Sequence, residues 1–152
     1  MNACTIMVRM LFAVAVGFAL TTSAAPAARG QVDAPPQVNP RVIVDGKHPW
    51  VDTNLTVHKG ERFRFEAEGA IRWGSNPDQV AGPAGRGGTP NKVGAGGLIG
   101  RVGPNGKPFS VGHTRLPIMM PKDGKLYLGI NDFIFRDNAD AFTVTIVRVG
   151  AP

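Results

Sequence analysis

The stretch ERFRFEAEG, Glu61 to Gly69, alternates apolar and polar residues with a period of two. Phe63, Phe65 and Ala67 fall on one side of an extended chain, and charged side chains fall on the other. Successive side chains of a β-strand point to opposite faces, so this spacing predicts a strand with one buried face. The pattern indicates a fold in which sheets pack together through one side.

Similar patterns recur along the rest of the chain. They predict strands at Arg41 to Val44, Leu55 to Val57, Ile71 to Trp73, Leu98 to Val102, Lys125 to Ile130 and Ala141 to Val149. No stretch of ten residues has the spacing of an amphipathic helix, and 20 Gly and 13 Pro mark frequent turns. Many short strands separated by such turns are typical of an all-β fold. We therefore expect an antiparallel jelly-roll β-sandwich.

The N-terminal segment has the composition of a secretory signal peptide. Arg9 precedes the apolar run LFAVAVGFAL, Leu11 to Leu20, and small residues follow it. The run is too short to cross a bilayer as a helix, so we expect no membrane span after signal cleavage. The expected organisation is a signal at 1–28, a Pro-rich linker at 29–40 and one domain at 41–150, in a secreted or periplasmic protein.

Charge and cysteine usage limit the possible functions. The single cysteine, Cys4, lies within the predicted signal, so the remaining domain has no thiol for a disulfide or a metal site. Removal of Arg9 with the signal lowers the formal net charge from +6 to +5. The basic residues are scattered singly, without the clusters of a nucleic-acid groove, and we expect no nucleic-acid binding. Electrostatic attachment to an anionic polymer is a further hypothesis.

The stretch NDFIFRDNADAF, Asn131 to Phe142, is rich in oxygen-bearing side chains. Asp132, Asp137 and Asn138 are candidate ligands for a hard cation such as calcium, which takes about six to eight oxygens. The spacing is not that of an EF-hand, because the Gly and the terminal Glu of that motif are missing. Alternatively, Asp and Asn stand here because they favour turns. The residues by themselves leave both interpretations open.

Other residues with chemical potential are few. His48, His58 and His113 lie far apart on predicted loops, and the sequence has no nucleophile elbow and no H-x-x-x-H pair. No carboxylates are paired for acid-base work apart from those that a metal would use, so we expect no enzymatic activity. Trp50 and Trp73 either stack on a sugar or fill the core, and for Trp50 the core is the favoured interpretation.

Five segments, taken in order, carry a family resemblance. They are WVDTNLTVHKGERFRFEAEGAIRWG (Trp50 to Gly74), GPAG (Gly82 to Gly85), GGLIGRVG (Gly96 to Gly103), PFSVG (Pro108 to Gly112) and GKLYLGINDFIFRDNADAFTVTI (Gly124 to Ile146). Together they resemble the calcium-dependent galactophilic bacterial lectins of the LecA-like, or PA-IL-like, family. The resemblance covers Arg41 to Val149 and implies a jelly-roll sandwich of the galactose-binding-domain-like type with one bound calcium.

The resemblance implies a set of calcium ligands. These would be the side chains of Asp132, Asp137 and Asn138, the backbone carbonyl of Trp73, and a carbonyl from Ile134 or Phe135. Because such a set supplies about five or six oxygens, sugar hydroxyls or water would complete the coordination. In the family the hairpin Asp and Asn side chains also hydrogen-bond the sugar.

Two features depart from the family pattern. Where galactose-binding members hold the sugar with a His and a Gln, this chain has Thr89 and Lys92. Thr89 can hydrogen-bond a hydroxyl and Lys92 would favour an acidic sugar, so the expected partner is a galactoside-like or acidic glycan. Asp140 replaces a small residue, and we expect it to accept a left-handed conformation.

These inferences predict a secreted, calcium-dependent carbohydrate-binding module that is not an enzyme. The alternative is a structural or adhesive β-sandwich whose hairpin binds calcium for rigidity, or not at all, and which binds no sugar. Family members are often tetramers, so the resemblance is also compatible with a homo-oligomer.

Overall fold

The computed structural model describes residues 39–150. The predicted signal at 1–28 lies outside the described residues, as does the predicted linker up to residue 38. Within 39–150 the chain forms nine strands and no helix. In this part of the chain there is accordingly no helix long and apolar enough to cross a membrane.

All strand pairings are antiparallel. The strands are β1 (Arg41–Asp45), β2 (Trp50–Val57), β3 (Arg62–Arg72), β4 (Val80–Ala81), β5 (Leu98–Val102), β6 (Phe109–Ser110), β7 (Ile118–Met119), β8 (Gly124–Ile130) and β9 (Ala139–Arg148). One prediction is wrong: the strand expected at Ile71 to Trp73 is not separate. It continues from the ERFRFEAEG strand because β3 keeps its pairing with β9 from Phe63 to Arg72.

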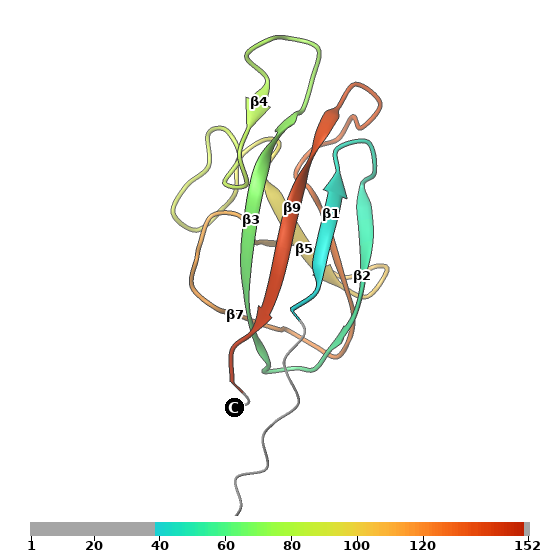
Figure 1. Ribbon diagram of the computed structural model, residues 1–152, viewed down its shortest axis with the longest axis vertical. Helices are drawn as coiled ribbons and strands as arrows, with labels where there is room; N and C mark the ends of the chain where they lie inside the picture. The colour runs from blue at the N-terminus through green and yellow to red at the C-terminus, as the bar shows by residue number, and fades with distance from the viewer. Residues whose placement is uncertain (1–38, 151–152) are drawn as a thin grey trace, which may run out of the picture. The chain divides into compact units, whose positions relative to one another are not determined.

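The strands form two sheets. One has the order β1-β9-β3-β4, with β7 also paired to β3, and the other has the order β2-β8-β5-β6. Figure 1 shows β1, β9 and β3 side by side, with β4 and β7 against opposite ends of β3. The sheet that contains β1, β9, β3 and β7 faces the sheet that contains β2, β8, β5 and β6. This is the arrangement of a jelly roll, and it confirms the predicted fold class.

The core lies between the inner faces of the two sheets. On β3 the inward residues Phe63 and Phe65 are buried, while Arg62 and Glu66 on the other face are exposed, as the period of two predicts. The largest fully buried side chains are Phe63, Ile71, Leu98, Met120, Leu126, Leu128, Ile130, Phe142 and Ile146. Both sheets contribute to this set, so the apolar face that a strand buries determines how that strand is oriented in the sandwich.

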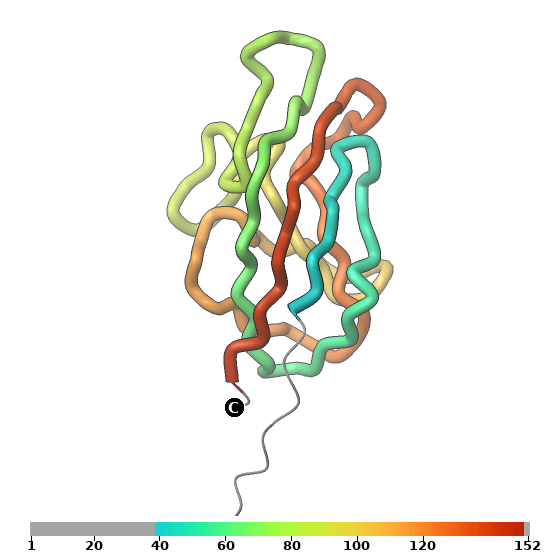
Figure 2. Tube along the Cα trace, viewed as in Figure 1, coloured from blue at the N-terminus to red at the C-terminus, as the bar shows by residue number. Residues whose placement is uncertain are grey.

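One end of the sandwich collects three connections. The residues 131–138 between β8 and β9 lie beside the turn between β1 and β2, as the tube in Figure 2 shows, and Asn138 bonds to Gly46 there. The pairing of Arg72 with Ala139 brings the end of β3 to the same place. The predicted metal ligands therefore gather at this end.

Candidate functional site

The connection between β8 and β9 holds its ligand candidates against the sandwich. The Asp132 N–H donates to the Ile130 carbonyl at 2.9 Å, and the Asn138 N–H donates to the Phe135 carbonyl at 3.3 Å. Between them the side chain of Phe133 is 96% exposed. The chain thus turns sharply after β8 and again before β9, with an apolar side chain displayed in solvent.

Two buried side-chain oxygens in this connection have no hydrogen-bond partner, namely Oδ2 of Asp132 and Oδ1 of Asn138. The remaining polar atoms of both side chains are engaged: Asp132 Oδ1 accepts from Phe133 N at 2.7 Å, and Asn138 Nδ2 donates to the Gly46 carbonyl at 3.0 Å. Within residues 39–150 these are the only buried side-chain oxygens without a partner. A buried unpaired acceptor costs about 1–3 kcal/mol. Oxygens of this kind fit a hard cation.

Trp73 directly follows β3, and Asn138 directly precedes β9. The last pair of the β3–β9 ladder is Arg72 with Ala139, so the next residues along the two chains are Trp73 and Asn138. The Trp73 N–H donates to the Gln79 carbonyl at 2.8 Å. Its side chain packs against the core and against Gly96, where a Cβ would overlap the indole ring. The core interpretation therefore holds for Trp73.

The two carbonyl candidates in the connection differ in their surroundings. Phe135 is half-buried and its carbonyl accepts the hydrogen bond from Asn138 N, whereas Ile134 is 52% exposed. The third side-chain candidate, Asp137, is exposed. The structure thus gathers Asp132, Asn138 and Trp73 at one end of the sandwich, with Asp137 and Ile134 on the same short connection.

The Gly-rich loop between β4 and β5 carries the predicted sugar contacts. Thr89 and Lys92 face each other at its tip through backbone hydrogen bonds of 2.8 and 3.1 Å. Lys92 lines a cavity of about 430 Å³ together with Asp132, while Thr89 is not among the residues that line it. Of the two predicted sugar contacts, only Lys92 therefore shares a cavity with Asp132.

Asn131 fastens this loop to the connection and was not identified as a site residue from the sequence. Its Nδ2 donates to the Gly94 carbonyl at 3.0 Å, its N–H donates to the Gly97 carbonyl at 2.8 Å, and its own carbonyl accepts from Gly96 N at 3.0 Å. The sequence feature that could have identified Asn131 is its position next to Asp132, directly after a predicted strand. Its partners, however, lie more than thirty residues away in the chain.

The cavity has mainly aromatic and apolar walls. Its lining residues are Pro49, Trp50, Lys92, Val93, Ile99, Pro108, Phe109, Ser110, Ile130, Asn131, Asp132, Phe133 and Phe135. Trp50 is half-buried here and is not part of the core cluster, so the prediction that it fills the core is wrong. Its ring lies over Gly129, where a Cβ would approach it to 2.9 Å. The Arg101 guanidinium lies 4.2 Å from its centroid.

The histidines do not assemble into a site. His48 is exposed beside Asp45, at 3.5 Å, and His58 is exposed beside Asp123, at 3.6 Å. In the described part of the chain no group of three or more His, Cys, Asp or Glu could hold a metal. The candidate set above relies instead on two carboxylates supplemented by amide and backbone oxygens.

Asp140 adopts a left-handed backbone conformation, with a φ of 69°, as the sequence predicts. Its carbonyl accepts a hydrogen bond from Gly46 N at 3.0 Å. Asp is among the residues that tolerate this conformation best. The residue therefore shapes the entry into β9 next to the candidate ligands.

The chain has similar proteins among solved structures. No family model matches the chain, and no curated protein matches it. Among solved structures it is similar to one described as "EclA N-terminal domain; PllA-like lectin". That match has a TM-score of 0.61 and 27% sequence identity, and it covers 72% of this chain and 95% of the other. The likeness supports a lectin family of the LecA type.

Proposed function

We propose that this chain is a carbohydrate-binding protein without enzymatic activity, in which a bound calcium ion takes part in holding the sugar. The similarity to a lectin domain supports carbohydrate binding in general. The observation that carries the calcium step is the pair of buried, unpaired oxygens on Asp132 and Asn138. Both were predicted as ligands from the sequence.

In this proposal the protein supplies the side chains of Asp132, Asp137 and Asn138 and the carbonyl of Trp73. The fifth group is a backbone carbonyl of the connection, from Ile134 or Phe135; the Phe135 carbonyl accepts one hydrogen bond, from Asn138 N, and keeps a second lone pair. Calcium takes about six to eight oxygens, so positions remain for two neighbouring hydroxyls of a sugar. The bound ion would attract those hydroxyl oxygens and fix the orientation of the ring.

Lys92 is the residue that we expect to select which sugar is bound. It lines the cavity that also contains Asp132, so its ammonium group can approach a ligand held there. A carboxylate on the sugar would form a charge-assisted hydrogen bond with it. The proposed ligands are therefore galactoside-like or acidic glycans. The N-terminal sequence supports action outside the cytoplasm.

A structural role is the second candidate, and one contact favours it. The Asn138 amide links the connection to Gly46 in the turn between β1 and β2, so an ion at Asn138 would also stiffen this end of the sandwich. A glycan array in calcium and in chelator separates the two. The proposed function predicts calcium-dependent binding to a subset of glycans, whereas a structural ion predicts calcium-dependent stability with no glycan bound.

The metal step is tested by thermal unfolding of the full chain with calcium, with magnesium and with chelator. A ligand that binds only the native state raises the melting temperature, because its binding adds RT ln(1 + [L]/Kd) to the free energy of unfolding. We expect calcium to raise it and chelator to reverse the change, with a smaller effect of magnesium. A melting temperature indifferent to calcium would rule out the metal site.

A further inference from the structure

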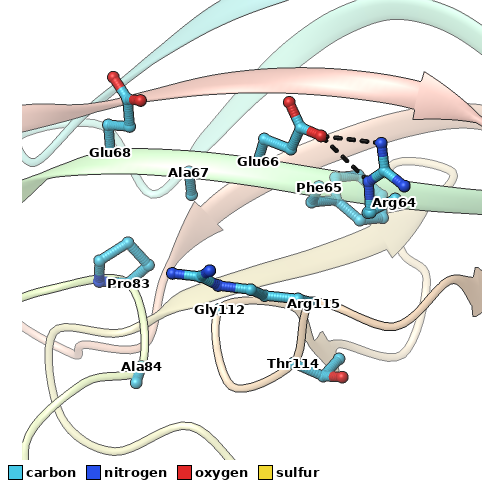
Figure 3. A pocket seen from close by; sticks show the side chains of 10 residues that line it. All are labelled: Arg64, Phe65, Glu66, Ala67, Glu68, Pro83, Ala84, Gly112, Thr114 and Arg115. Atoms are coloured by element: carbon cyan, nitrogen blue, oxygen red, sulfur yellow. Dashed lines mark hydrogen bonds and ion pairs between the residues drawn. The ribbon is translucent and has the colours of Figure 1, made fainter.

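The outer edge of β3 is open in its central part. Strand β4 pairs with Ile71 and Arg72, and β7 pairs with Arg62 and Phe63. Between these two short strands, from residue 64 to residue 70, no described strand pairs with this edge. A cavity of about 510 Å³ lies against it. Figure 3 shows the side chains that line this cavity.

The register of β3 shows which backbone groups face the open edge. In an antiparallel ladder, residues alternate between those whose N–H and C=O face the partner strand and those whose groups face away from it. The Arg62 carbonyl accepts from Val149 N at 2.8 Å, on the side of β9, while the Glu61 carbonyl accepts from Met120 N on the opposite side. The N–H and C=O groups of Phe65 and Ala67 therefore point into the open edge, spaced as a strand requires.

The cavity is bounded by two loop segments that hold each other in place. Pro83 and Ala84 come from the loop after β4, and Gly112, Thr114 and Arg115 come from the loop between β6 and β7. A Cβ at Gly112 would overlap the Pro83 carbonyl, so the two segments are in close contact. The Leu98 backbone bonds to both, accepting from Gly112 N at 3.0 Å and donating to the Pro83 carbonyl at 2.8 Å.

Charge is unevenly distributed around the cavity. Glu66 is paired with Arg64, at 2.9 Å, on the solvent face of β3. On the other side, the Arg115 side chain extends beside β3 toward Pro83 (Figure 3). Within the described residues no carboxylate lies within 4.0 Å of the Arg115 guanidinium. The side of the cavity formed by the loop between β6 and β7 thus carries the Arg115 guanidinium, a cation that has no carboxylate partner among the described residues.

We propose that this edge binds a short extended peptide of another protein by strand addition, with an acidic side chain of the peptide facing Arg115. The backbone groups of Phe65 and Ala67 supply the hydrogen bonds of such a mode, and the flanking cavity supplies side-chain selectivity. Arg115 selects a carboxylate by charge complementarity. This site lies apart from the metal-ligand candidates and does not depend on the proposed function.

The geometry limits the length of the peptide and excludes a second copy of β3. A β3 strand from another molecule, paired across residues 64–70, would continue into the space occupied by β4 and β7. The edge can accept only a segment that fits between these two strands. Its apolar contacts, Phe65, Ala67, Pro83 and Ala84, offer no exposed aromatic ring on which a sugar would stack.

The test uses acetylated, amidated peptides of the form Val-Thr-X-Thr-Val, in which X is Glu, Gln or Lys, titrated into the isotope-labelled full chain by NMR. In strand addition the side chains of both Val and of X face inward, and those of Thr face solvent. We expect the Glu peptide to shift the amide signals of Phe65 and Ala67 most. It should bind about fivefold more tightly than the Gln peptide, since the ion pair is partly exposed.

Two variations separate strand addition from other binding. Methylation of the X amide nitrogen removes a donor that faces β3 and should weaken binding about fivefold or more, whereas methylation of a Thr amide nitrogen should not. Arg115→Glu should reverse the preference from the Glu to the Lys peptide. The matched control Arg41→Glu, at the opposite edge of the sheet, should leave it unchanged.

The proposal is overturned if Glu, Gln and Lys peptides bind equally or not at all, or if the position of the methyl group makes no difference. It is also overturned if galacturonate, rather than a peptide, shifts Phe65 and Ala67 in an Arg115-dependent way. All titrations are repeated in chelator, where peptide binding should be unchanged. Failure of the calcium site would therefore leave this test intact.

Discussion

The two ends of the sandwich both carry clustered polar side chains, but they use them differently. At the turn between β2 and β3, the Glu61 carboxylate accepts from His58 N at 2.8 Å and pairs with Arg148 at 3.1 Å. At the same end the Asp123 carboxylate accepts from Lys59 N at 2.7 Å. At the opposite end, oxygens of Asp132 and Asn138 are buried without partners. The carboxylates named at the first end have hydrogen-bond or ion-pair partners within the protein, whereas two oxygens at the other end have none.

The largest expected effect is on the calcium-dependent free energy of unfolding, at the end that carries the unpaired oxygens of Asp132 and Asn138. In chelator, Asp132→Asn should not lower the free energy of unfolding, because it neutralises a carboxylate with a buried unpaired oxygen. With calcium at about a hundredfold excess over Kd, the parent should gain about 2.7 kcal/mol and the variant much less. Urea unfolding in both buffers measures this difference.

The control for Asp132→Asn is Asp78→Asn, which changes an exposed Asp in the loop between β3 and β4. It should retain the full gain in calcium. If Asp132→Asn also retained that gain, Asp132 would not be a metal ligand and the contrast between the two ends would lose its functional meaning.

A smaller effect is expected at the satisfied end, and it should not depend on calcium. Glu61→Ala removes the acceptor of His58 N and the partner of Arg148, on a side chain that is only 14% exposed. We expect a loss of about 1–2 kcal/mol from these charged hydrogen bonds, equal with calcium and with chelator. Glu66→Ala, which removes an exposed pair with Arg64, should cost little by comparison. A calcium-dependent loss in Glu61→Ala would contradict the comparison.

The backbone at the entry to β9 gives a third test. Asp140 has a φ of 69°, which a β-branched residue rarely adopts. Asp140→Val should therefore destabilise the fold by about 1 kcal/mol, while Asp140→Gly should be neutral or slightly stabilising. Chemical unfolding of both variants measures the difference. Equal stabilities would show that the left-handed conformation at this position is not constrained.

The smallest effect is expected from an exposed pair on the outer face of the second sheet. Hydrogen bonds from the Asn54 backbone and from Lys125 lower the pKa of Asp52 below its ordinary value of 3.8. The folded chain thus holds the carboxylate form more strongly than the unfolded chain does. The resulting stability is present at neutral pH and is lost as the pH falls below 3.8 through the lowered pKa.

Asp52→Asn should consequently be less stable than the parent at neutral pH, by less than the other substitutions, since solvent reaches both side chains of the pair, with Lys125 54% and Asp52 33% exposed. The difference in the free energy of unfolding between Asp52→Asn and the parent should become smaller in acid. Unfolding curves at neutral pH and at about pH 3 test the sign. A gap that widened in acid would mean that the carboxylate of Asp52 is not the stabilised form.

Much of this protein could be predicted from local patterns in the sequence. The alternation in ERFRFEAEG gives the buried and exposed faces of β3 because side-chain direction in a strand depends only on the parity of the residue number. The candidate ligands Asp132 and Asn138 were identified because oxygen-rich side chains stand between two apolar strands. The left-handed Asp140 followed from the tolerance of that residue type.

Only the tertiary structure decided which of these residues meet. The sequence does not state that Trp50 lies over Gly129, outside the core, or that Asn131 holds the Gly-rich loop, because both depend on pairings between distant segments. The continuity of β3 past Gly69 and its open edge between β4 and β7 likewise depend on which strands lie beside it. Residue type sets what each side chain can do, and the strand order determines which oxygens are left without a partner.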